Sequence, residues 1–115
     1  MNEPEFEAKV IRVLDGDTVD VVFSFPFGIS VTKRVRMYGI NAPETRTRNR
    51  EEKLRGKSAK KRLVELLGKE RVCTIKYYGD GKFGRPLGEL FVNGVNLNQV
   101  LVKEGHAVSY FGGKR

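Results

Sequence analysis

Three segments in the first third of the chain show the alternation of apolar and polar residues that is typical of β-strands. Residues 6–14 alternate with one change of phase, residues 18–25 are rich in Val and Phe, and residues 29–37 alternate throughout. A period of two residues indicates a strand with one buried face. We therefore predict a tight hairpin at Asp15-Gly16-Asp17, where glycine supplies a positive φ, and a second reversal near residues 26–28.

The period becomes helical between Glu51 and Leu67. The small and apolar residues of this segment fall within one arc at about 100° per residue, namely Gly56, Ala59, Leu63, Leu66 and Leu67. Gly68 directly follows the last of them, and glycine commonly ends a helix. The segment is therefore predicted to form a long amphipathic helix.

Two more strands are predicted after this helix, over residues 71–78 and 86–92, with the loop 79–85 between them. Asn93-Gly94 is a hairpin signal. Asn96 can then cap a short helix, whose apolar residues are Leu97, Val100 and Leu101.

Five short strands interrupted by a helix predict a mixed β+α fold, namely a five-stranded OB-fold-like β-barrel with one longer and one shorter helix. A chain of 115 residues supports one modest core. We expect a single domain over residues 1–115, with flexible ends at about residues 1–6 and 112–115.

The charge of the chain suggests which partners it could bind. The chain carries a formal charge of +8, and Arg46 to Arg62 contribute nine Lys or Arg against two acids. Nucleic acid, an anionic membrane or an acidic protein would suit such a chain. A basic helix face is most often simply solvated, but this one begins beside Glu44, which favours tracking of a phosphate backbone.

The remaining composition excludes several kinds of cross-link, metal site and catalytic site. Cys73 is the single cysteine, so neither an intrachain disulfide nor a structural zinc site is possible, and a buried strand cysteine is expected. His106 is the single histidine, which excludes a pair of catalytic histidines. No apolar run could span a bilayer, and no signal peptide is visible. We expect a cytoplasmic monomer without membrane contact. Secretion by way of a leader that has been removed stays an alternative.

Candidate chemistry gathers around the third predicted strand. Its parity places Arg36 on the face opposite Val31, where the end of a closed barrel could rim a cleft. The turn at Pro43 then presents Glu44, and the first hairpin presents the carboxylate of Asp17. Arginine neutralises phosphate, and carboxylates hold a divalent cation or accept a proton from water. Taken singly, these residues could equally be turn formers, a solvated strand arginine and a helix-initiating acid.

Four blocks, in this order, resemble the staphylococcal nuclease (thermonuclease) family. They are Asp15-Gly16-Asp17-Thr18, Arg36 through Glu44, Lys82-Phe83-Gly84-Arg85, and Gly105-His106-Ala107. The similarity runs from about Val10 to Ala107. It implies a calcium-dependent nuclease that hydrolyses DNA, RNA or both to 3′-phosphate products.

The resemblance also implies roles for individual residues. Asp17, Asn41 and the backbone carbonyl of Ala42 match the calcium ligands, although the family usually has Asp at the position of Asn41. Glu44 matches the general base. Two arginines match those that bind the scissile phosphate, namely Arg36 and Arg85.

Nucleic-acid contacts are expected from the loop near Arg85 and from the basic segment. The candidates are Lys82, Phe83, Tyr110, Arg46 and Arg48, with Phe111 as a further stacking residue. Phe83 replaces a tyrosine that often binds phosphate in the family. Aromatic residues beside an open groove suit single-stranded or frayed DNA or RNA. Because of Asn41 and Phe83, a catalytically silent nucleic-acid-binding module on the same barrel stays the main alternative, and a protein-interaction barrel a further one.

Overall fold

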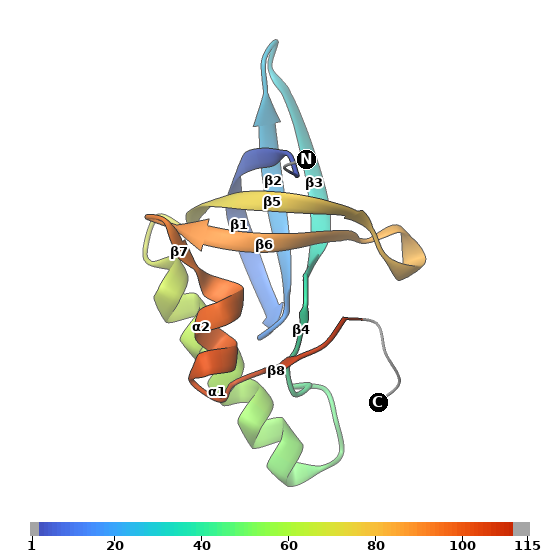
Figure 1. Ribbon diagram of the computed structural model, residues 1–115, viewed down its shortest axis with the longest axis vertical. Helices are drawn as coiled ribbons and strands as arrows, with labels where there is room; N and C mark the ends of the chain where they lie inside the picture. The colour runs from blue at the N-terminus through green and yellow to red at the C-terminus, as the bar shows by residue number, and fades with distance from the viewer. Residues whose placement is uncertain (1–2, 112–115) are drawn as a thin grey trace.

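The computed structural model describes residues 3–111, and five of its strands close into a barrel (Figure 1). Their order is β3-β2-β1-β5-β6, with antiparallel pairing between neighbours, and parallel pairing between β3 and β6 closes the ring. The strands are β1 (Glu5–Asp15), β2 (Thr18–Phe25), β3 (Ile29–Met37), β5 (Val72–Asp80) and β6 (Pro86–Val92). The predicted OB-fold-like barrel is confirmed.

Two α-helices lie together at one end of the barrel (Figure 1). They are α1 (Arg50–Leu67) and α2 (Leu97–Lys103), and the side chains of Asn49 and Asn96 cap their N-termini. Gly68 ends α1 with φ 75°, as predicted. None of the helices within residues 3–111 is long and apolar enough to cross a membrane.

Short elements complete the fold. A 3₁₀ helix, η1 (Lys82–Gly84), lies in the loop before β6, and β7 (Val95–Asn96) pairs with β6 across the hairpin predicted at Asn93-Gly94. The two-residue strands β4 (Ile40–Asn41) and β8 (Val108–Ser109) pair with each other, which brings the C-terminal segment beside the end of β3.

Strand β1 begins inside the N-terminal segment for which flexibility was expected. Glu5 and Phe6, placed in the flexible end by the sequence, pair with Lys76 and Ile75 of β5. The expectations for residues 1–2 and 112–115 lie outside the described residues.

The core fills the barrel and the space between barrel and helices. It includes Val19, Val35, Leu63 and Leu90, none of which is exposed to solvent. Cys73 is also buried, as predicted, and burial raises the pKa of its thiol to about 12. The thiolate is therefore disfavoured, which is consistent with a packing role.

The hairpin at Gly16 is confirmed, but the predicted reason for its glycine is wrong. Asp15 pairs with Thr18, yet Gly16 is not among the residues with positive φ. A Cβ at Gly16 would instead lie 2.7 Å from the Cβ of Ala59 on α1. Glycine is required there because the helix passes directly over the turn.

A second close approach joins α1 to the segment after β4. A Cβ at Gly56 would lie 2.5 Å from the carbonyl oxygen of Glu44 and 3.0 Å from that of Pro43. These neighbours are backbone atoms, which cannot rotate away as a side chain can. The glycine therefore sets the distance between α1 and the backbone that carries Glu44.

Gly56→Ala should destabilise the protein, although the same change in an exposed helix would stabilise it by about 1 kcal/mol. Forcing helix and loop apart should cost ~1–3 kcal/mol of unfolding free energy, as overpacking does. Urea denaturation measures the change, and Lys57→Ala on the exposed face of α1 serves as the control. A Gly56→Ala variant more stable than the wild type would show that this contact does not constrain the loop.

Candidate active site

One buried carboxylate joins the first hairpin to the end of β3. Oδ2 of Asp17 accepts a hydrogen bond from the backbone N–H of Ala42 at 2.8 Å and lies 3.0 Å from Nη1 of Arg36. Its Oδ1 accepts from the hydroxyl of Thr18 at 2.9 Å. Burial strengthens these interactions, because water competes little for either partner. Asp17 thus fixes the position of Arg36 at the mouth of the barrel.

Arg36 also reaches the second candidate ligand. Its Nη2 donates to Oδ1 of Asn41 at 3.1 Å, so oxygens of the hairpin turn and of β4 converge on a single guanidinium. Arg36 lies on the face of β3 opposite the buried Val35 and Met37, as the alternation predicted. The fork of the guanidinium suits two acceptors at once.

The loop that carries Glu44 is fastened on both sides by the same hairpin. On the N-terminal side of Glu44, Asp17 accepts a hydrogen bond from the N–H of Ala42. On its C-terminal side, Oδ1 of Asp15 accepts hydrogen bonds from the N–H and the hydroxyl of Thr45, at 3.0 and 2.7 Å. The N–H of Glu44 itself donates to Glu52 of α1 at 3.3 Å. The carboxylate of Glu44 has no hydrogen bond or ion pair within residues 3–111, and the residue is exposed. A fixed backbone therefore presents an unengaged carboxylate.

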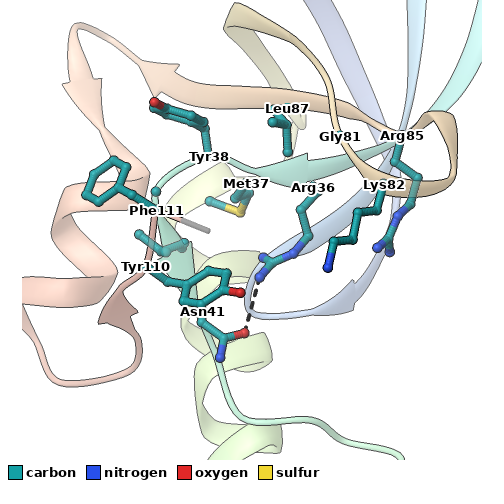
Figure 2. A pocket seen from close by; sticks show the side chains of 12 residues that line it. Arg36, Met37, Tyr38, Asn41, Gly81, Lys82, Arg85, Leu87, Tyr110 and Phe111 are labelled. Carbon is teal, nitrogen blue, oxygen red and sulfur yellow. Dashed lines mark hydrogen bonds between the residues drawn. The ribbon is translucent and has the colours of Figure 1, made fainter. Parts of the chain in front are cut away.

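A cavity of about 390 Å³ opens beside Arg36 (Figure 2). Figure 2 shows Arg36, Lys82 and Arg85 on one side of it and the rings of Tyr38 and Phe111 on the other, with Tyr110 between them. The cavity therefore has a basic end and an aromatic end. Such a combination suits a phosphate with an attached base.

The aromatic end is built by tertiary contacts. Tyr38 stacks on Tyr78 with ring centroids 4.0 Å apart, and Phe111 meets the edge of Tyr38 at 5.6 Å. Phe111 also covers Gly39, where a Cβ would lie 2.8 Å from its ring. The β4–β8 pairing brings Tyr110 and Phe111 to this place. Tyr38 itself forms part of the wall of the cavity.

Arg85 lies at the basic end with part of its hydrogen-bonding capacity unused. Its Nε is buried and has no hydrogen-bond partner within the described residues. The guanidinium carbon lies 5.9 Å from the ring centroid of Phe83, which is 92% exposed on a backbone with φ 62°. A buried donor without an acceptor is costly, and it suits a site that receives an anion.

The structure brings together about half of the residues expected in the site. The cavity is lined by Arg36, Asn41, Lys82, Arg85 and Tyr110, and Asp17 contacts it through Arg36. Glu44, Ala42, Phe83, Arg46 and Arg48 do not line this cavity. Sequence reasoning missed the fastening of Thr45 by Asp15 and the role of Asn98. The buried side chain of Asn98 donates to the carbonyl of Tyr38 at 2.9 Å.

The oxygen donors of the three candidate ligands fit calcium in kind. Calcium takes carboxylate, amide and backbone carbonyl oxygens in flexible geometry, and Asp17, Asn41 and Ala42 supply one of each. No group of three or more His, Cys, Asp or Glu side chains within residues 3–111 could hold a metal. Asp17 is thus the source of formal negative charge among these donors, and a low ligand charge favours weak calcium binding.

Comparison with known proteins agrees with the geometry. A family model described as "Staphylococcal nuclease homologue" matches residues 34–115. The chain is 35% identical over 117 residues to Endonuclease YhcR of Bacillus subtilis (strain 168), covering 95% of this chain and 9% of that protein. It is 31% identical over 115 residues to Micrococcal nuclease of Shigella flexneri, covering 92% and 59%.

An uncharacterized endonuclease of Escherichia coli O157:H7 is 31% identical over 107 residues, covering 92% of this chain and 62% of that protein. The chain thus spans less than two thirds of the length of each of these three relatives. The family match covers the end of the strand that carries Arg36, the Glu44 loop and the loop of Arg85, and the barrel is the fold that the resemblance implied. The chain belongs to the staphylococcal nuclease family.

Proposed function

We propose that this protein is a nuclease that hydrolyses the phosphodiester bonds of DNA, RNA or both. The observation that carries the proposal is the basic end of the cavity, where Arg36, held by Asp17, faces the same space as Arg85 and Lys82. Three cations at one end of an open cavity favour a phosphate ligand. The relatives named endonuclease and micrococcal nuclease support the same conclusion.

The two arginines bind the scissile phosphate in this proposal. Hydrolysis passes through a five-coordinate phosphorus with added negative charge on its oxygens. Guanidinium groups that are already in position stabilise that charge without having to reorganise. Arg36 is positioned by its hydrogen bonds to Asp17 and Asn41, and Arg85 keeps an unused buried donor.

Glu44 acts as the general base. Its carboxylate accepts a proton from water, the water oxygen attacks phosphorus, and the bond from phosphorus to the 5′ oxygen breaks. The 5′ oxygen takes up a proton and leaves a 3′-phosphate on the other fragment. Support comes from the fastened loop: Asp15 and Asp17 hold both sides of it, and Gly56 packs against the backbone of Glu44.

Calcium is the proposed cofactor, held by the side chains of Asp17 and Asn41 and by the carbonyl of Ala42. When bound, it supplies positive charge that neutralises phosphate oxygens. Asp17 would then serve both the metal and Arg36, whose Nη1 lies 3.0 Å from its Oδ2.

Single-stranded or frayed nucleic acid is the proposed substrate. The aromatic end of the cavity offers Tyr38, Tyr110 and Phe111 as surfaces on which an unpaired base can stack. A paired base would first have to leave its duplex. The stacking surfaces accept any base, so sequence preference should be weak.

Glu44→Gln should lower kcat at least about 10²-fold on labelled single-stranded DNA in calcium, because the amide cannot accept the proton. Binding of the DNA should change little. The matched control is Glu51→Gln, which removes an exposed carboxylate from the first turn of α1. The wild type should lose activity when calcium is chelated. Near-normal turnover by Glu44→Gln would remove Glu44 from the mechanism, and no cleavage by the wild type would refute the nuclease.

Asn41→Asp should raise calcium affinity and lower the calcium needed for half-maximal activity, by roughly tenfold, because it adds a charged ligand. Calorimetric titration of calcium measures the first effect. Asn93→Asp, which adds the same charge at the exposed turn after β6, is the control.

The same variant separates the nuclease from a silent nucleic-acid-binding module. In a silent module Asn41→Asp would give no cleavage and would slightly weaken nucleic-acid binding. Identical calcium titrations for Asn41→Asp and the wild type would show that residue 41 is not a ligand.

A further inference from the structure

Arg85 also lines a second cavity, of about 240 Å³, whose wall is strongly basic. Barrel, loop and helix all contribute cations to it: Arg12, Arg34, Arg46, Lys60 and Arg85. One carboxylate, that of Asp15, shares the wall with these five cations. None of the strand arginines belongs to the basic segment that the sequence pattern singled out.

Two of these arginines are placed by strand register. Arg12 of β1 and Arg34 of β3 both lie directly opposite Asp20 of β2. The carboxylate of Asp20 accepts two hydrogen bonds from Arg34, at 2.8 and 3.2 Å. The pKa of Asp20 is lowered by this hydrogen bond and by the charges of Arg34 and Arg12. Asp20 therefore stays ionised and orients Arg34, leaving Arg12 beside it.

Of the other cations of the cavity, Arg12 interacts with the charge of Asp20 without forming an ion pair with it. Arg12, Arg46 and Lys60 make no hydrogen bond or ion pair within the described part of the chain. The lining carboxylate of Asp15 is engaged with the uncharged donors of Thr45. Like charges gathered around one concave surface repel one another and raise the local positive potential. An anion would relieve that repulsion.

We propose that this second cavity binds the phosphodiester next to the scissile one on the same nucleic-acid strand. Arg85 lines both cavities, so a strand that crosses it presents successive phosphates to the two sides. Recognition would be by charge, without base contacts, and therefore independent of sequence. This subsite rests on the proposed nuclease function and adds contacts to the strand beyond the site of hydrolysis.

Binding of two fluorescent ligands tests the subsite: thymidine octanucleotide, and thymidine dinucleotide, whose one phosphodiester cannot occupy both cavities. Wild type, Arg12→Gln, Lys60→Gln and the double variant are compared by fluorescence anisotropy with calcium chelated, because the proposed nuclease would otherwise cut the ligands. Lys69→Gln, an exposed lysine after α1 that lines neither cavity, is the matched control.

The double variant should raise the Kd of the octanucleotide by about tenfold, and several-fold more than that of the dinucleotide. The slope of log Kd against log salt should fall by about 0.7 for each phosphate that the variant no longer binds. Equal weakening of the two ligands, or the same weakening in Lys69→Gln, would overturn the subsite. Either single variant decides the question if the double one does not fold.

Whether the wild type cleaves the octanucleotide distinguishes a failure of the subsite from a failure of the nuclease function. If the octanucleotide is cut and the variants bind it as the wild type does, the subsite fails and the nuclease stands. If the octanucleotide is not cut but its binding depends on Arg12 and Lys60, the phosphate-binding cavity stands and the nuclease fails.

Discussion

The site depends on the interactions of one buried carboxylate, that of Asp17. A buried charge is stable only when it is paired and hydrogen-bonded, and Asp17 finds its partners on three separate stretches of chain. Thr18 belongs to its own hairpin, Ala42 begins the Glu44 loop, and Arg36 lies near the end of β3. Removing the carboxylate would leave the N–H of Ala42 without its acceptor and would take from Arg36 its charged partner. The same carboxylate therefore holds the hairpin, the end of β3 and the start of the Glu44 loop together.

Closure of the barrel brings the second arginine, Arg85, to the site. The parallel pairing of β3 with β6 sets Arg36 opposite Leu87, two residues after Arg85. Residues separated by almost half of the chain are thereby brought to one cavity. Asn98 supports this junction, because its buried amide binds Leu90 and Gly88 of β6 and the carbonyl of Tyr38. The core of the fold thus holds the cavity wall in place.

Local periodicity was sufficient to predict the barrel strands, the long helix and its glycine cap, because each depends on neighbours within a few residues. The four motif blocks were sufficient to predict that Arg36, Asn41, Lys82 and Arg85 lie in one site. The sequence could not reveal the two-residue strands β4 and β8, since their stability comes from pairing with each other. Nor could it show why Gly16 is glycine, because Ala59 reaches it only after α1 has packed on the hairpin. The cross-strand register that gathers Arg12 and Arg34 is equally a tertiary fact.

Substitution of Arg36 by lysine tests the central claim most directly, namely that the fork held by Asp17 and Asn41 serves phosphodiester hydrolysis. Lysine keeps the charge but cannot span both oxygens. Arg62→Lys is the control, since Arg62 also makes a forked pair, with Glu104, but lines neither cavity. With single-stranded DNA and calcium, kcat/KM should fall at least about 10²-fold in Arg36→Lys and stay within about twofold of the wild type in Arg62→Lys. Full activity in a folded Arg36→Lys protein would contradict the account.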